Sequence, residues 1–159
     1  MKNLRKYRIA VVQMDSRNDK GANVKYACQC IDEAAANGAK LISFPELYRI
    51  MTLEGAQVIF TPASFTMATG KEHWECILRT RAIENACYII AADQIGQKHE
   101  FLAYGHSMVI DPWGTIIAKA RDEAGMFYAD IDLDYEDKIR QKVPVLKNRR
   151  ADIYEVKRR

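Results

Sequence analysis

Phe44-Pro45-Glu46-Leu47-Tyr48-Arg49 joins a predicted strand to a predicted helix. The strand is the apolar run at 40–44, and Pro45 ends it because proline has no N–H for the sheet ladder. A helical pattern follows over residues 47–54. Glu46 therefore lies at the carboxyl end of a buried strand, the edge where open α/β sheets bind ligands. Its carboxylate fits two roles, a first-turn residue favoured by the helix dipole or a general base.

Upstream of this junction, the sequence predicts a strand, a helix and a second strand. Residues 7–13 are almost continuously apolar and rich in β-branched side chains, which is typical of a strand covered on both faces. Apolar residues then recur along one stripe of a helix at 22–37, and Asn37-Gly38 supplies a left-handed stop. With the strand at 40–44, this order is the unit that builds parallel sheets with right-handed crossovers.

Downstream, helical and strand patterns alternate before a run of shorter strands. We predict helices at 47–54 and 71–85, strands at 56–60, 87–92, 105–110, 115–118 and 127–131, and a loop at 61–66. The buried stripe of the second helix is predicted as Trp74, Ile77, Leu78, Ala82 and Asn85. Residues 111–114, Asp-Pro-Trp-Gly, form a tight-turn sequence. Asp132 or Asp134 caps a last helix that ends near Lys142.

Composition indicates one globular domain over residues 1–159. The net charge of +3 is too small to indicate a nucleic-acid partner. No apolar run is long enough to cross a membrane, and no apolar segment follows the basic start, so we expect a cytoplasmic protein. The four cysteines lack paired zinc-site spacing and the three histidines are scattered, so the sequence implies no metal and no cofactor.

Separated motifs in one order make the chain similar to a known family. They are Phe44-Pro45-Glu46, FTPASFTMATG at 60–70, His73-Trp74, LRTRAIEN at 78–85, YGHSMVIDPWG at 104–114, and Arg149-Arg150 before Asp152-Ile153-Tyr154. Together they resemble the nitrilase superfamily of carbon–nitrogen hydrolases, and most closely its omega-amidase and deaminated-glutathione-amidase-like branch. The resemblance covers nearly all of the sequence.

The resemblance implies a fold class and a chemistry. The fold is α/β, an α/β/β/α sandwich, and family members pair across helices. A cysteine nucleophile, a glutamate base and an oxyanion-stabilising lysine hydrolyse the amide bond of small ω-amides and release ammonia. The thiol needs the adjacent base, because it is a weak nucleophile at its free pKa. The oxyanion needs a fixed cation or N–H groups.

This chain departs from the family in one respect. The family carries Phe-Pro-Glu twice, with its lysine and cysteine between the two copies, and this chain carries the motif once. Residues 38–43 match the flank of the first copy, and residues 47–49 with 55–56 match the flank of the second. In the second register the nucleophile position falls on Ala39; in the first register Glu46 is the base without a partner. Cys76, in a helix, and Cys87, at a strand start, are not at the family's nucleophile position.

We therefore expect a shortened nitrilase-like sandwich whose catalytic set is reduced to Glu46, with no amidase turnover by itself. If the chain is active, its expected ligand is a small-molecule amide. With the intervening strands missing, we expect residues 8–12 and 41–44 to share a sheet with residues 58–60. The alternative is that the two halves pair with another chain.

The alternative function is a non-catalytic dimerisation or assembly module. The resemblance places a homodimer interface on the helix from Leu47 to Glu54 and the helix from Lys71 to Asn85. Tyr48, Met51 and Trp74 fit either such an interface or the helix core.

Three further side-chain roles are predicted downstream of the junction. Phe65 and Thr66 lie just past a strand's carboxyl end, where the resemblance implies a substrate-binding pocket wall; the alternative is an ordinary loop. Arg81 and Glu84 are predicted to form an ion pair at i, i+3. His106, inside a predicted strand, is expected to be a structural histidine.

Overall fold

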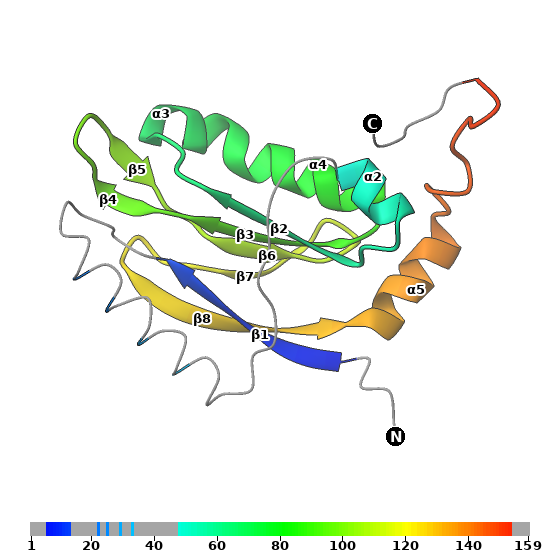
Figure 1. Ribbon diagram of the computed structural model, residues 1–159, viewed down its shortest axis with the longest axis horizontal. Coiled ribbons are helices and arrows are strands. Elements are labelled where there is room, and N and C mark those ends of the chain that lie inside the picture. The colour runs from blue at the N-terminus through cyan, green and yellow to red at the C-terminus, as the bar shows by residue number, and fades with distance from the viewer. Residues whose placement is uncertain are drawn as a thin grey trace.

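The computed structural model describes residues 6–13, residues 48–153 and four single positions between these ranges. Figure 1 shows a layer of helices over a four-stranded sheet, with a two-stranded sheet on the other side. The four single positions, Ala22, Lys25, Gln29 and Glu33, are helical and exposed, as the polar face of the helix predicted at 22–37 requires. The strand predicted at 40–44 and Glu46 lie outside the described residues.

The four-stranded sheet forms the centre of the domain. Its strands are β2 (Val58–Ala63), β3 (Tyr88–Asp93), β6 (Met108–Ile110) and β7 (Ile116–Lys119), in the order β2-β3-β6-β7. β2 and β3 are parallel, and the other pairs are antiparallel. The sequence prediction of these strands is confirmed, with ends that shift by a few residues.

The prediction of a loop from Thr61 is wrong, because β2 continues through Pro62 to Ala63. The amides of Tyr88 and Gln94 donate to the carbonyls of Gln57 and Ala63. Bonding sides alternate along a strand, so the odd-numbered residues of β2 face β3 and the even-numbered residues face the outer edge. The missing N–H of Pro62 therefore falls at the outer edge, where it interrupts no bond to β3.

Four helical segments cover one face of this sheet. They are α2 (Tyr48–Leu53), α3 (Met67–Thr69), the π-helical turn η1 (Gly70–Trp74) and α4 (Glu75–Asn85). Helical structure therefore starts four residues earlier than the predicted helix at 71–85. The prediction that Ile77 is buried is wrong, because 41% of this side chain is exposed. Only Leu78, Ala82 and Asn85 of α4 are buried, and Ile77 lies beside this stripe.

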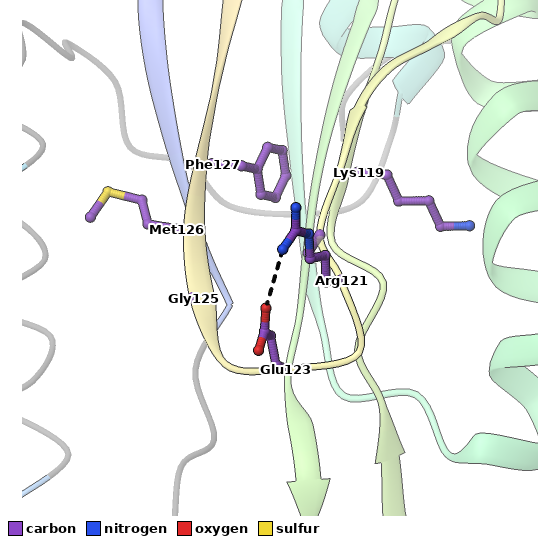
Figure 2. Close-up of a pocket in the computed structure, with 7 residues that line it drawn as sticks. Lys119, Arg121, Glu123, Gly125, Met126 and Phe127 are labelled. Carbon is purple, nitrogen blue, oxygen red and sulfur yellow. Dashed lines mark ion pairs between the residues drawn. The ribbon is translucent and has the colours of Figure 1, made fainter.

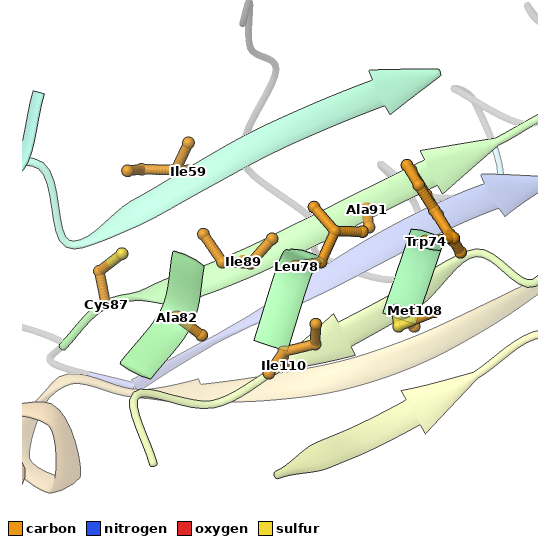
Figure 3. Packing of buried hydrophobic residues seen from close by; sticks show 9 residues of the cluster. All are labelled: Ile59, Trp74, Leu78, Ala82, Cys87, Ile89, Ala91, Met108 and Ile110. Atoms are coloured by element: carbon orange, nitrogen blue, oxygen red, sulfur yellow. The ribbon is translucent and has the colours of Figure 1, made fainter. Parts of the chain in front are cut away.

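The helix-side core joins this narrow stripe to the sheet. Figure 3 shows Trp74, Leu78 and Ala82 pointing from the helices toward Ile89 of β3 and Ile110 of β6. All five side chains are almost completely buried. Burying a side chain of this size contributes roughly 1.5–3 kcal/mol, so the stripe is a main source of stability.

The second sheet consists of β1 (Lys6–Gln13) and β8 (Gly125–Asp132), which pair antiparallel along all eight positions. The expectation that residues 8–12 share a sheet with residues 58–60 is therefore wrong. β1 pairs along its full length with β8, in a layer separate from the four-stranded sheet. Apolar side chains, not strand pairing, connect the two layers. These are Tyr88, Ile90 and Val109 of the large sheet, against Ala129 and Ile131 of β8.

A short hairpin, β4 (Ile95–Gln97) and β5 (Leu102–Tyr104), follows β3 and is absent from the sequence prediction. Its strands are only three residues long, too short to show a period. The prediction that His106 lies inside a strand is also wrong. Its φ of 57° is left-handed, as is the 71° of Gly105, so β6 begins only at Met108.

Helix α5 (Leu133–Lys142) follows β8 directly. Of the two candidate caps, Asp132 is the one used, since its side chain accepts hydrogen bonds from the amides of Asp134 and Tyr135. From this helix, Arg140 pairs with the buried Glu136 at 2.6 Å and donates to the carbonyls of Ala86 and Ala56 at 3.0 and 3.2 Å. α5 is thereby fixed to the turns that precede β2 and β3.

Candidate functional site

The candidate site lies where the parallel strands β2 and β3 end. Phe65 follows β2, and its backbone N–H donates to the Asp93 carboxylate at 2.9 Å. Its ring packs against Trp74 at a centroid distance of 4.9 Å, so the side chain is half-buried. Thr66 caps α3 by accepting from the Thr69 amide at 3.3 Å. Both residues are thus held in place by these contacts, and their role as the wall of a substrate-binding pocket stays a prediction.

Asp93 is the site residue that the sequence analysis missed. Its side chain is only 2% exposed, and Oδ1 accepts from the amides of Phe65 and Gln94. Burial raises the pKa of this carboxyl to about 6, although these backbone N–H groups and nearby His106 act to lower it. Oδ2 has no hydrogen-bond partner among the described residues. The available signal was an acidic residue at the carboxyl end of an apolar strand.

His106 is held by both ring nitrogens. Nδ1 lies 2.9 Å from the Tyr104 carbonyl, and Nε2 lies 3.1 Å from an Asp122 carboxylate oxygen. The ring stacks on Tyr104 with centroids 4.1 Å apart, and the His106 carbonyl accepts from the Trp74 indole. These contacts fit the structural role expected for His106.

The two described cysteines differ in exposure. Cys87 is fully buried, and burial raises the pKa of its thiol to about 12. Cys76 is exposed on the outer face of α4, in a groove that it shares with Glu72 and Arg79. Cys28 and Cys30 lie outside the described residues. Within the described part of the chain, no cluster of three or more His, Cys, Asp or Glu side chains could hold a metal ion.

The helices α2, η1 and α4 carry the residues that the sequence analysis assigned either to an interface or to the core. Trp74 is 2% exposed and belongs to the core. Tyr48 and Met51 are half-buried against the same core, and the Tyr48 hydroxyl lies 2.9 Å from Thr61 Oγ1. The predicted ion pair between Arg81 and Glu84 is confirmed, at 2.6 Å.

A cleft of about 330 Å³ opens between the ends of β7 and β8, away from Phe65. Figure 2 shows Phe127 pointing into the space between the two sheets and Arg121 paired with Glu123 at 3.9 Å. Both charged side chains are exposed, at 89% and 70%, and such pairs contribute little. We assign no chemistry to this cleft.

The helical layer and the two sheets define an α/β sandwich with polar groups at the carboxyl ends of β2 and β3. The sequence profile of the carbon-nitrogen hydrolase family matches residues 8–48 and 43–141. This chain belongs to the carbon-nitrogen hydrolase family, and the expected shortened nitrilase-like α/β/β/α sandwich is confirmed at the level of its class. The two matches overlap at 43–48, the segment that contains the single Phe-Pro-Glu.

Relatives with established names are similar over most of this chain. Deaminated glutathione amidase of Mus musculus is 48% identical over 112 residues, which are 70% of this chain and 35% of the relative. Omega-amidase NIT2 of Danio rerio is 43% identical over 116 residues, 72% of this chain and 42% of the relative. The chain thus matches less than half the length of these relatives.

Solved structures support the same fold. The C. elegans NitFhit protein superposes with a TM-score of 0.66 at 47% identity, covering 70% of this chain and 27% of that protein. Saccharomyces cerevisiae Nit3, a member of the nitrilase superfamily, superposes with a TM-score of 0.62 at 36% identity, covering 67% and 40%. Among the described residues, no helix is long and apolar enough to cross a membrane.

Proposed function

We propose that this chain is a carbon–nitrogen hydrolase domain with an incomplete catalytic set, which by itself releases no ammonia from small ω-amides. The overlap of the two family matches at 43–48 carries this proposal. One Phe-Pro-Glu serves both matches, so the segment that separates two such motifs in the family, with its cysteine and lysine, has no counterpart here. Only Glu46 of the catalytic set is then left.

The positions of the two described cysteines support the proposal that the catalytic set is incomplete. The covalent route needs a thiol that ionises beside a base. Cys87 cannot serve, because it is buried and its pKa is about 12. Cys76 lies on the outer face of α4, whereas Phe65 packs on the inner side of the helices, against Trp74.

Ammonia release tests the proposal. The purified chain is incubated with deaminated glutathione and with a small ω-amide, and Mus musculus deaminated glutathione amidase serves as the active control. We expect ammonia at the buffer rate, unchanged in Glu46→Gln. A rate well above buffer that disappears in Glu46→Gln would contradict the proposal and assign Glu46 a catalytic role.

A second candidate function is assembly through the helix face, as a homodimer. Three apolar side chains on this face are substantially exposed: Leu53 at 37%, Ile77 at 41% and Ile83 at 49%. They lie on α2 and α4, the helices that the family resemblance assigns to subunit pairing. Exposed apolar side chains on these two helices offer the apolar area that the core of an interface needs.

Charge substitutions separate an interface from the core. We expect Ile77→Asp to convert a dimer to a folded monomer in sedimentation, and Ile117→Asp, an equally exposed position on β7, to leave the dimer intact. Tyr48→Asp and Met51→Asp should instead unfold the protein, because both side chains pack on the core. A wild-type chain that sediments as a monomer at micromolar concentration would exclude the homodimer.

A further inference from the structure

The turn between β6 and β7 carries an exposed tryptophan. Trp113 is 46% exposed, so much of its indole ring lies outside the core. The turn itself is fixed, because Asp111 Oδ1 accepts from the amides of Trp113 and Thr115, each at 2.9 Å. Arg79 of α4 also donates to the carbonyl of Gly114 at 2.9 Å. A large aromatic side chain that is rigidly held and left in solvent is typical of a binding hot spot.

The end of α5 continues this surface. Lys142 Nζ lies 4.9 Å from the centroid of the Trp113 ring, which is cation–π distance. The next residue, Val143, is 39% exposed. It borders a hollow of about 120 Å³, lined by Arg140, Val143, Pro144, Val145, Leu146 and Lys147. We call Trp113, Lys142, Val143 and this hollow the α5-end surface.

The hollow has apolar walls that backbone hydrogen bonds hold in place. The amide of Val145 donates to the carbonyl of Val143 at 2.8 Å, and the amide of Asn148 donates to the carbonyl of Pro144 at 3.0 Å. An apolar cavity of roughly 150 Å³ is large enough to bind benzene. A hollow of about 120 Å³ therefore suits one leucine side chain. Because its walls are already fixed, binding there costs little ordering.

Positive charge surrounds the α5-end surface. Residues 138–150 contain six basic side chains and no acidic one. Two of the six are paired within the chain, Arg140 with Glu136 and Arg150 with Asp152. Three others are exposed lysines: Lys138, Lys142 and Lys147. Asp111, the acidic residue of the neighbouring turn, is buried and occupied by the two amides. The surface therefore attracts a negatively charged partner.

We propose that the α5-end surface binds an acidic peptide segment of a partner protein, with a leucine side chain in the hollow and carboxylates facing Lys142 and Lys147. A nucleic acid shares the negative charge but has no aliphatic side chain to fill the hollow, and the net charge of the chain is only +3. The proposal does not depend on whether the chain hydrolyses amides. It also differs from the homodimer proposal, which is tested at Ile77.

Fluorescence anisotropy with labelled peptides tests the proposal. We expect saturable binding of the fluorescein-labelled peptide EEELEEE, at least tenfold weaker binding of EEESEEE, and no binding of KKKLKKK. Lys142→Glu and Val143→Asp should each weaken binding of EEELEEE at least tenfold. Lys71→Glu and Ile117→Asp, at exposed positions of η1 and β7, are the matched controls and should leave it unchanged. Added salt should weaken the binding, because the lysines are exposed.

Several results would overturn the proposal. One is no saturable binding of EEELEEE at about 1 mM. Equal affinity for EEESEEE would show that the hollow takes no side chain. A single-stranded oligonucleotide that displaces EEELEEE at an equal or lower concentration would assign the surface to nucleic acid. A dimer that Val143→Asp converts to a monomer in sedimentation would assign it to a second copy of the chain. If Val143→Asp fails to fold, Lys142→Glu and the serine peptide still decide the question.

Discussion

Asp93 offers a pH-dependent test of the carboxyl end of β3. Its carboxyl is buried, accepts two backbone hydrogen bonds through Oδ1, and has a pKa of about 6 in the folded protein against a model value of 3.8. Asp93→Asn keeps the shape and an accepting oxygen for the amides of Phe65 and Gln94, and it removes the titration. We therefore expect the variant to lose one component of the pH dependence of stability.

The sign follows from proton binding. Between about pH 4 and pH 6 the folded state keeps the Asp93 proton and the unfolded state has lost it, so this component of stability decreases as pH rises. A shift from 3.8 to about 6 is close to two units, and each unit corresponds to about 1.4 kcal/mol. At pH 4 part of this change has already occurred, so the wild-type chain should lose about 2.4 kcal/mol relative to Asp93→Asn between pH 4 and pH 7.5.

Urea denaturation followed by tryptophan fluorescence measures this difference at each pH, since Trp74 lies in the nearby core. The difference in unfolding free energy between Asp93→Asn and wild type should increase with pH over this window. Asp130→Asn, at an exposed aspartate of β8, is the matched control and should show no such increase. A difference for Asp93→Asn that stays constant within about 0.5 kcal/mol would refute the reasoning.

Three further predictions concern other elements. Gly70→Ala places a Cβ 2.2 Å from Cγ of Tyr104 and should destabilise the protein by about 1–3 kcal/mol in urea denaturation. Gly125→Ala, with no atom within 4 Å of the added Cβ, is the control and should cost less than about 1 kcal/mol. Asp132→Ala removes the cap of α5 and should cost about 1 kcal/mol by thermal unfolding; an unchanged midpoint would contradict the role of the cap. Cys87 should react with a thiol reagent, as mapped by mass spectrometry, only when the protein unfolds.

Local signals in the sequence predicted much of the fold. The apolar run at 87–92 gave β3, the Asp-Pro-Trp-Gly turn gave the connection between β6 and β7, and one of the two candidate caps proved to start α5. Each of these elements depends on neighbours in the chain. The pairing of β1 with β8 does not, because it joins Lys6 to Asp132 across most of the sequence. An apolar pattern indicates that a strand is buried, but it does not indicate which other strand pairs with it.

The candidate site was predicted only in part. Phe65 and Thr66 were located at the end of β2 through the resemblance, but Asp93, which orients the Phe65 backbone, was missed. A single carboxylate after an apolar strand reads equally well as an exposed loop residue, and its burial depends on packing that no local pattern contains. The left-handed backbone of His106 was missed for a similar reason, since nothing but Gly105 beside it signals a turn.

Arg140 has a consequence for the order in which the chain is made. Its guanidinium binds the carbonyls of Ala56 and Ala86, which lie 84 and 54 residues earlier and directly precede the two parallel strands. On a ribosome, both strands emerge long before this arginine does. The turns before β2 and β3 therefore gain these two hydrogen bonds only after α5 has been synthesised, so the anchoring of both strands depends on a segment that is made after them.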